Sequence, residues 1–256
     1  LACGQAKLTA PPVAVGIGAH GCDTREECAA MTLLMAERLP GSACEVVNDA
    51  ALVALSAGSG QAAGLIAGTG SVAVALDADG NWLQTGGWGW VIGDEGGASG
   101  LVRAAIGAVL HDWDRGKQND PLTVALVEAF GVTHLLDLPA QLLRSPASGW
   151  SRHAPLIFDC LPKDSRLARQ VVDAAVMSLT SLILRLRERG ARFNQVVAAG
   201  GVIRHQPILF GLLANALRQH DDTLTLSLLQ QAPVTGALVL ARHIAPATLS
   251  FSRRGE

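Results

Sequence analysis

Apolar and polar positions follow two kinds of pattern along this chain. Short apolar runs bounded by glycine, proline or polar residues are typical of buried strands, and apolar residues spaced three or four positions apart are typical of helices. The expected strands are 13–18, 44–47, 64–67, 71–76, 82–84, 194–198 and 223–228. The expected helices are 24–39, 49–57, 95–111, 121–130, 133–143, 151–161, 164–189, 207–219 and 233–243. Thr24, with Glu27 three residues later, predicts a capping box at the start of the first helix.

The order of these elements predicts a mixed α/β fold. Short turns between 64 and 84 indicate an antiparallel meander, and the strand–helix–strand order near the carboxyl end indicates a parallel unit. Gly58-Ser59-Gly60 is a candidate boundary between a first segment, 1–59, and a larger segment, 60–232. The last helix, about 233–246, could return to pack on the first segment.

Composition excludes several classes of protein. The chain has 256 residues, of which 49% are hydrophobic, and its net charge of −2 argues against nucleic acid or a membrane surface as partner. Five cysteines without CxxC spacing predict reduced thiols, and neither a disulfide framework nor a zinc site. The apolar stretch 171–186 contains polar residues and is shorter than the ~20 residues of a membrane span, and no signal peptide is recognisable. We therefore expect a cytoplasmic protein.

Asn48 and Asp49 follow the apolar run 44–47, at the carboxyl end of a predicted strand, where α/β folds place ligands. A carboxylate at this position can accept a proton from a substrate hydroxyl. The alternative is that one of the two residues only caps the next helix, which is the commoner role of Asn and Asp at such a place. Asp49 is a candidate general base, and the local sequence leaves the cap open.

Two glycine-containing turns are candidate sites for a nucleotide. The backbone amides and hydroxyls of Gly68-Thr69-Gly70-Ser71 could surround a phosphate, although an ordinary tight turn explains the pattern as well. It is not a Walker loop, because it lacks the GK[ST] ending and the helix that follows. Gly200-Gly201 ends the predicted strand 194–198, where glycine would let a base lie against the backbone. A plain turn at a helix start is an equally good interpretation.

The segment from Gly86 to Gly97 combines six glycines in twelve residues with Trp88, Trp90 and the adjacent acids Asp94 and Glu95. Tryptophan faces stack on sugar rings or bases, and carboxylates accept hydrogen bonds from hydroxyl groups. The alternative places both tryptophans in the core and uses Asp94 to cap the next helix. The rare combination of glycine and tryptophan favours a binding loop.

In this order and spacing, these stretches resemble the N-acetylglucosamine kinases and the BadF/BadG-type ATPases of the actin-like, ribonuclease H-like ATPase superfamily. The resemblance covers about 13–245, and its most specific part is Gly-Gly-Trp-Gly, then four further residues, then Asp-Glu-Gly. It implies a two-lobe fold, ATP and Mg²⁺ as cofactors, and an amino sugar as substrate. The implied roles are Asp49 as catalytic base; Asn48, Gly87, Trp88, Gly89 and Asp94 on the sugar; Gly68, Thr69, Gly70 and Ser71 on the ATP phosphates; and Gly200 and Gly201 on adenosine.

One part of the family pattern is not found in this chain. The family opens with a strand and a first phosphate loop of the form Asp-Gly-Gly-Gly-Thr, whereas the run 13–18 matches a later strand. Because the sequence also begins with Leu1, we expect the opening strand and the first phosphate loop to be missing from it.

The resemblance implies phosphorylation of N-acetylglucosamine at its 6-hydroxyl, with glucosamine kinase as the alternative. An activator ATPase would need cysteines placed for an iron–sulfur cluster, and a sugar-responsive repressor would need a helix-turn-helix and a zinc motif. The sequence shows none of these patterns. The expected partner is a small amino sugar, without nucleic acid or membrane, and a homodimer is possible.

Overall fold

The computed structural model describes residues 11–58 and 61–246. The strands are β1 (Ala14–Ala19), β2 (Ala43–Asn48), β3 (Ala62–Ala67), β4 (Ser71–Leu76), β5 (Trp82–Gly86), β6 (Gln195–Ala199) and β7 (Thr225–Leu228). The longer helices are α2 (Arg25–Arg38), α3 (Asp49–Leu55), α4 (Ala98–Asp114), α5 (Pro121–Phe130), α6 (Leu138–Arg144), α9 (Arg166–Glu188), α11 (Pro207–His220) and α12 (Val234–Ile244). Shorter helices are η1 (Leu135–Asp137), α7 (Ala147–Trp150), η2 (Ser151–His153), α8 (Pro155–Asp159), η3 (Leu161–Lys163) and α10 (Gly201–His205).

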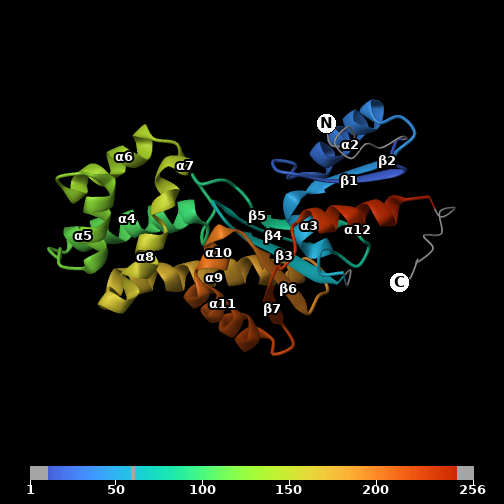
Figure 1. The fold of residues 1–256 in the computed structure, drawn as a ribbon. Coiled ribbons are helices and arrows are strands. Elements are labelled where there is room, and N and C mark those ends of the chain that lie inside the picture. The colour runs from blue at the N-terminus through green and yellow to red at the C-terminus, as the bar shows by residue number, and fades with distance from the viewer. Residues whose placement is uncertain (1–10, 59–60, 247–256) are drawn as a thin grey trace.

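The N-terminal lobe is built on the parallel pair β1–β2, whose register aligns Ala19 with Asn48 at the carboxyl ends. Helix α2 packs on β2, and α3 and α12 pack against β1 (Figure 1). The predicted capping box is confirmed: the Thr24 hydroxyl accepts a hydrogen bond from Glu27 N at 3.2 Å, and the Glu27 carboxylate accepts one from Thr24 N at 2.9 Å. The box fixes where α2 begins, directly after the loop that follows β1.

The larger lobe contains a five-stranded sheet in the order β5-β4-β3-β6-β7. Strands β3, β4 and β5 form the expected antiparallel meander, and β3, β6 and β7 run parallel. Helix α9 lies against β4 and β5, while α3 packs on β3, β4 and β6. Helices α4 to α8 form a separate group at one end of this lobe (Figure 1).

Helix α3 is the element that both lobes share. Its residues from Ala50 to Leu55 are all buried. Two glycines let neighbouring backbones approach it: a Cβ at Gly64 in β3 would lie 2.4 Å from the Ala50 carbonyl oxygen, and one at Gly236 in α12 would lie 2.0 Å from the Leu52 carbonyl oxygen. Such distances exclude any side chain, so these contacts require glycine.

Several helix boundaries differ from the sequence predictions. The helix expected from residue 95 begins at Ala98, because Asp94 and Gly96 have positive φ angles of 63° and 84°, which a right-handed helix does not accept. The helix expected at 151–161 is divided into η2, α8 and η3, where Pro155 and Pro162 interrupt the backbone hydrogen bonding. The helix expected at 133–143 starts as η1 and continues as α6. The short helix α10 was not predicted.

Among the described helices taken singly, α9 has the length and apolar content of a membrane span, at 23 residues. More than half of its most apolar stretch is buried. Its partners are α4, α11 and the strands β4 and β5. Burial on several sides by protein is the environment of a core helix.

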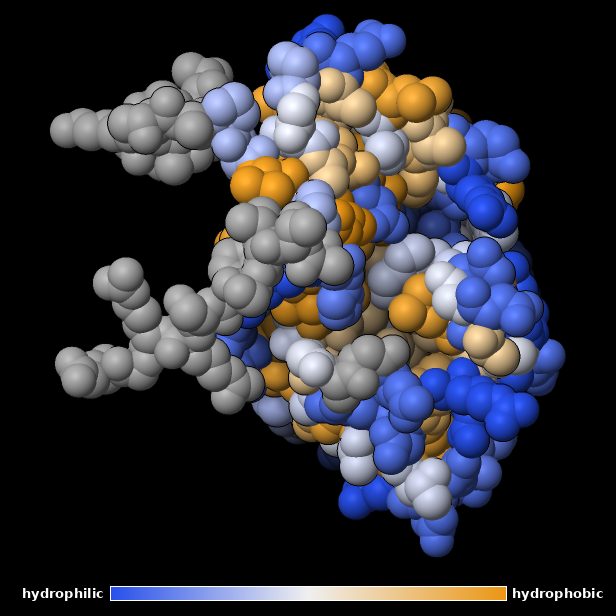
Figure 2. Space-filling model, turned by 90° about the vertical axis from the view of Figure 1, so that its right-hand side faces the viewer, coloured by the Kyte–Doolittle hydropathy of each residue, from blue (hydrophilic) through white to orange (hydrophobic). Residues whose placement is uncertain are grey.

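The face shown in Figure 2 combines a lower part that is largely hydrophilic with an upper part on which apolar residues gather. Large exposed apolar side chains on α2 are those of Met31, Leu33 and Leu34.

Candidate functional site

Two cavities meet at the turn between β3 and β4. The first, here called the Asp49 cavity, has a volume of about 460 Å³ and is lined by His20, Asp23, Asn48, Asp49, Ile66, Thr69, Gly70, Ser71, Val72, Gly87, Gly89, Trp90, Asp94, Ser99 and Ala147. The second, here called the Arg152 cavity, has a volume of about 450 Å³ and is lined by Gly68, Thr69, Ala98, Ser148, Ser151, Arg152, Ala154, Pro155, Phe158, Gly201, Val202, His205 and Gln206. Thr69 lines both cavities, so the turn that carries it forms their common wall.

Asp49 is the first residue of α3 and follows directly on β2. The cap of α3 is Asn48, whose Oδ1 accepts a hydrogen bond from Ala50 N at 2.9 Å. Asn48 is therefore the helix cap, as the alternative interpretation expected for one of the two residues. Asp49 is not the cap, and it lines the Asp49 cavity. The His20 imidazole lies beside it, with Nδ1 at 3.8 Å from Asp49 Oδ2. A carboxylate with two-fifths of its side chain exposed can still receive a substrate proton.

The two predicted nucleotide turns lie beside each other. They follow β3 and β6, which are paired so that Ile66 faces Ala199. Gly200 has φ of 109°, and a Cβ on it would lie 2.4 Å from the Ala67 carbonyl oxygen, so this close contact requires glycine. Gly68 and Gly201 both line the Arg152 cavity, whereas Gly200 supports them from behind. The structure thus brings the two predicted turns together at the edge of one sheet.

Helix α4 begins at the same turn. Ala98 N donates a hydrogen bond to the Gly68 carbonyl at 2.8 Å, and Ser99 N donates to the Thr69 carbonyl at 3.0 Å. Helix α4 therefore starts with its positive end directed at the wall between the cavities. Ser99 is almost fully buried, lines the Asp49 cavity, and its hydroxyl has no hydrogen-bond partner among the described residues. Its contact with the site was not predicted.

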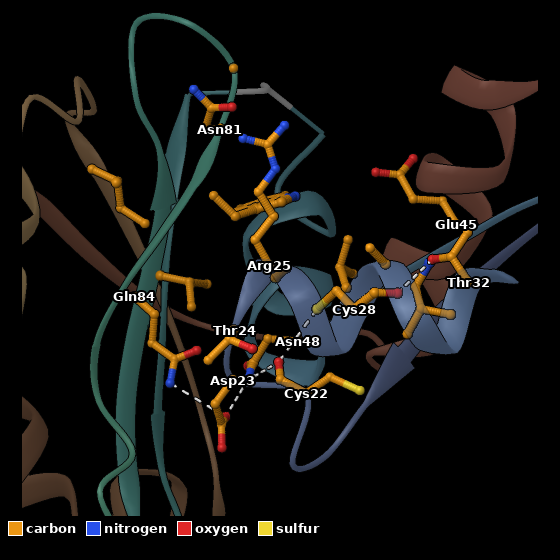
Figure 3. Close-up of a pocket in the computed structure, with 18 residues that line it drawn as sticks. Cys22, Asp23, Thr24, Arg25, Cys28, Thr32, Glu45, Asn48, Asn81 and Gln84 are labelled. Atoms are coloured by element: carbon orange, nitrogen blue, oxygen red, sulfur yellow. Dashed lines mark hydrogen bonds between the residues drawn. The ribbon is translucent and has the colours of Figure 1, made fainter. Parts of the chain in front are cut away.

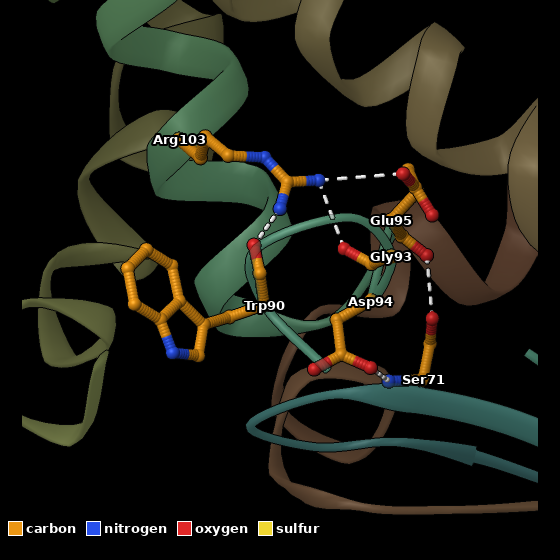
Figure 4. Close-up of polar contacts among 6 residues, drawn as sticks. All are labelled: Ser71, Trp90, Gly93, Asp94, Glu95 and Arg103. Carbon is orange, nitrogen blue, oxygen red and sulfur yellow. Dashed lines mark hydrogen bonds and ion pairs between the residues drawn. The ribbon is translucent and has the colours of Figure 1, made fainter. Parts of the chain in front are cut away.

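The carboxylate of Asp94 binds to the 68–71 turn and does not cap a helix. Its Oδ1 accepts a hydrogen bond from Ser71 N at 3.3 Å, and the Ser71 hydroxyl donates to the Glu95 carbonyl at 2.7 Å (Figure 4). The cap of α4 is Gly97, which makes no side-chain cap bond. The interpretation of Asp94 as a helix cap is therefore wrong.

Arg103 of α4 holds the glycine-rich loop, here defined as 86–97, from the side opposite to Ser71. Its guanidinium donates to the carbonyl of Trp90, to the carbonyl of Gly93 at 2.8 Å, and to the Glu95 carboxylate at 3.3 Å (Figure 4). A planar guanidinium that binds three groups fixes their relative orientation. These hydrogen bonds fix the conformation of the 86–97 loop, despite its glycine content.

The two tryptophans of the loop have different environments. Trp90 lines the Asp49 cavity and packs edge-on against Trp150, with ring centroids 5.5 Å apart. Trp88 does not line this cavity, and 67% of its surface is exposed. Gly87 and Gly89 on either side of Trp88 do line it. The contact predicted between Trp88 and a sugar stays a prediction, and Trp90 has the position expected for such a contact.

Asp23 was not singled out from the sequence, although it stands on the loop after β1 as Asp49 stands after β2. Its Oδ1 accepts hydrogen bonds from Asn48 Nδ2 at 2.9 Å and from Gln84 Nε2 at 3.3 Å (Figure 3). Position in the loop after the apolar strand β1 was the signal that could have identified it. Arg103 carries no comparable local signal, because its partners are known only once the loop has folded.

A third cavity, here called the α2 cavity, lies between α2 and the β4–β5 hairpin and has a volume of about 320 Å³. Glu45 of β2 lines it, and burial raises the pKa of this carboxyl, against a smaller opposite effect of His243. Within 11–58 and 61–246, no group of three or more His, Cys, Asp and Glu side chains is placed to hold a metal ion. The carboxylates that line the Asp49 cavity are those of Asp23, Asp49 and Asp94.

Comparisons with known proteins agree with this architecture. The structure of a putative N-acetylglucosamine kinase from Chromobacterium violaceum matches with a TM-score of 0.68 at 24% identity, over 93% of this chain and 80% of that one. A putative N-acetylglucosamine kinase from Porphyromonas gingivalis matches with a TM-score of 0.61 at 22% identity, over 89% of this chain and 76% of that one. These likenesses confirm the predicted two-lobe fold, and they concern the fold alone.

Two curated relatives match by sequence. The N-acetyl-D-glucosamine kinase of Dictyostelium discoideum is 25% identical over 235 residues, which is 88% of this chain and 74% of that protein. The N-acetylmuramic acid/N-acetylglucosamine kinase of Clostridium acetobutylicum is 24% identical over 236 residues, 90% of this chain and 77% of that protein. A family model matches residues 4–241. The chain belongs to the BadF/BadG/BcrA/BcrD ATPase family.

Proposed function

We propose that this protein is an ATP-dependent kinase that transfers phosphate to the 6-hydroxyl of an amino sugar, with N-acetylglucosamine as acceptor. The observation that carries the proposal is the position of Thr69 in the wall between two cavities, one containing Asp49 and the other bounded by Gly68 and Gly201. A nucleotide in one cavity and a sugar in the other would meet at that wall. The kinase names of both curated relatives support the same reaction.

Asp49 is the proposed general base. Phosphoryl transfer needs an acceptor hydroxyl in line with the terminal phosphate, and a carboxylate that accepts the hydroxyl proton accelerates the step. Asp49 sits at the start of α3, and its neighbour Asn48 provides the cap, so the carboxylate is free for this role. Thr69 and the amides of Thr69 and Gly70 would bind the phosphates, because Gly68 N already donates to the Gly70 carbonyl and Ser71 N to Asp94.

The nucleotide would enter as its magnesium complex. Magnesium usually binds to phosphates and to one or two carboxylates, and keeps several of its waters, so it needs no closed cage of protein ligands. The carboxylates of Asp23, Asp49 and Asp94 line the Asp49 cavity, so oxygen ligands for the ion are present without a dedicated cage. The ion would offset phosphate charge, and the start of α4 adds a positive dipole on the same side.

We propose that the glycine-rich loop forms the side of the Asp49 cavity that contacts the sugar. Gly87 and Gly89 line the cavity, Trp90 offers an aromatic surface, and Asp94 can accept hydrogen bonds from sugar hydroxyls. Trp88 is retained as a contact for the sugar or its N-acetyl group, because it follows Gly87 directly. Glucosamine differs from N-acetylglucosamine only in the acyl group, and it is the alternative acceptor.

The test is phosphorylation by the purified full-length protein with MgATP and, in turn, N-acetylglucosamine, glucosamine, glucose and N-acetylmuramic acid. ADP release is measured, and ³¹P NMR identifies the phosphorylated position. We expect the highest kcat/KM and a 6-phosphate with N-acetylglucosamine. Thr69→Val should weaken the use of ATP and leave sugar affinity nearly unchanged. ATP hydrolysis without transfer to any of the four sugars would contradict the proposal.

A further inference from the structure

The Asp49 cavity contains a second carboxylate from the N-terminal lobe, that of Asp23. It lies at the point where both lobes come together, because Gln84 of β5 reaches across from the larger sheet to bind it. Asp23 also lines the α2 cavity on the other side of this contact (Figure 3). The residue therefore separates the two cavities as part of their common wall.

The two oxygens of the Asp23 carboxylate have different partners. Oδ1 accepts from Asn48 Nδ2 at 2.9 Å and from Gln84 Nε2 at 3.3 Å. Among the described residues, Oδ2 receives no hydrogen bond, and it points away from both donors in Figure 3. A carboxylate oriented through one oxygen presents the other in a fixed direction.

Asn48 is already occupied by the protein. Its Oδ1 accepts from Ala50 N at 2.9 Å, and its Nδ2 donates to Asp23 and to the Cys22 carbonyl at 3.3 Å. An amide with these three partners has little capacity left for a sugar. The family resemblance implied that Asn48 contacts the sugar. In this structure Asn48 instead orients Asp23, whose carboxylate is better placed for that contact.

We infer that Asp23 binds the acceptor, with Oδ2 accepting a hydrogen bond from a ring hydroxyl while Oδ1 keeps the carboxylate fixed between the lobes. This inference rests on the proposed function. Asp49 takes the proton of the reacting hydroxyl, and Asp23 binds a hydroxyl elsewhere on the same sugar. Specificity increases because an analogue that lacks the hydroxyl leaves a fixed carboxylate without its partner.

The variant Asp23→Asn tests the role of the Asp23 Oδ2 atom. The asparagine Oδ1 can still accept from Asn48 and Gln84, whereas an NH₂ group replaces Oδ2. Titration calorimetry of the full-length protein with N-acetylglucosamine should show a rise in Kd of roughly tenfold or more, which is the range for losing a hydrogen bond to a charged group. The affinity for ATP and the Tm should not change. An unchanged Kd for the sugar would overturn the inference.

Two further variants separate binding from structure. Gln84→Met removes the bond between the lobes and keeps both Asp23 oxygens, so we expect a much smaller rise in Kd than in Asp23→Asn. An equal loss in both variants would overturn the inference in favour of a role in lobe contact. Asp79→Asn removes an exposed carboxylate outside the Asp49 cavity, and it is the control for a lost negative charge.

Deoxy sugars identify the partner hydroxyl. N-acetylglucosamine analogues lacking the hydroxyl at C1, C3 or C4 are titrated against the wild type and Asp23→Asn. The analogue that lacks the hydroxyl bound by Asp23 should bind the wild type and Asp23→Asn with equal Kd, because this sugar has no hydroxyl for Asp23 to bind. A full difference with every analogue would overturn the direct contact. Absence of sugar binding by the wild type would overturn the proposed function as well, so the two failures are distinguishable.

Discussion

The carboxylate of Asp94 lies directly against Gly70: a Cβ built on Gly70 would come within 2.6 Å of Asp94 Oδ2. The same carboxylate accepts the bond from Ser71 N. The turn that carries Thr69 and the loop that carries Asp94 are thus in direct contact through one glycine. A shift of the 68–71 turn would displace the Asp94 carboxylate, and a shift of Asp94 would displace the turn. The proposed phosphate and sugar contacts are therefore coupled.

Gly70→Ala tests this contact. The added methyl group has no room unless Asp94 moves, so we expect higher KM values for both ATP and the sugar. Steady-state kinetics with each substrate varied in turn measures the effect. Gly107→Ala is the matched control, because a Cβ at Gly107 in α4 meets no atom within 4 Å. Normal kinetics in Gly70→Ala would show that the contact is not required.

Asp49→Asn should lower kcat by at least ~10²-fold, because the amide cannot accept the proton of the acceptor hydroxyl. The Tm should stay near that of the wild type, since Asn48 and not Asp49 caps α3. Single-turnover rates and thermal denaturation measure the two quantities. If Asp49→Asn turned over at the wild-type rate, Asp49 would have no part in the mechanism.

Asp94→Asn should raise the KM for N-acetylglucosamine by roughly tenfold or more, on the scale of ~1.5–3 kcal/mol for a hydrogen bond to a charged group. Asparagine tolerates the positive φ of 63° at this position and its oxygen can keep the bond from Ser71 N. The KM for ATP should change little. Asp94→Ala removes that bond too, and we expect it to lower the Tm in addition. A sugar KM that stays at the wild-type value in both variants would exclude Asp94 from contact with the sugar.

Glu45 provides a test of pH dependence. Burial raises its pKa in the folded protein, so the neutral form is favoured on folding. Its contribution to stability is therefore complete below the unfolded pKa of about 4.3 and is lost as the pH rises through the folded pKa. Glu45→Gln should raise the Tm relative to wild type at pH 7 and have no such effect near pH 4. Equal differences at both pH values would contradict the assigned cause.

Gly236→Ala should destabilise the protein by about 1–3 kcal/mol, as expected for overpacking. Alanine favours a helix more than glycine does, but here its Cβ would lie 2.0 Å from the Leu52 carbonyl oxygen. Urea denaturation gives the free energy of unfolding. Gly211→Ala in α11, where a Cβ meets nothing within 4 Å, should be neutral or slightly stabilising. A stabilised Gly236→Ala would mean that α12 can move away from α3 at no cost.

The sequence predicted the strands well, because each is a short apolar run that ends at glycine or at a polar residue. Asp49 was found for the same reason: it follows directly on such a run, and the structure leaves its carboxylate facing a cavity. The start of α4 was misplaced, since the positive φ of Asp94 is set by contacts with Gly70 and Ser71 that lie more than twenty residues away.

Long-range contacts also explain what was missed at the site. Trp88 and Trp90 are equivalent in sequence, and only the packing of Trp90 on Trp150 distinguishes them. Arg103 and Asp23 make their hydrogen bonds to partners on other elements, among them the 86–97 loop and Gln84. Local periodicity carries no information about such pairs.

Helix α3 has a consequence for how the enzyme could open and still react. Points close to an axis of rotation are displaced least, and both sheets pack against this one short helix. If the lobes swing about α3 when a sugar enters, Asp23 and Asp94, which stand on loops of different lobes, travel with their own lobes. Asp49, at the very start of α3, remains almost stationary. The Asp49 carboxylate would then keep its position and orientation while the lobes open and close. Only the residues that surround the sugar would have to return to their places in each catalytic cycle.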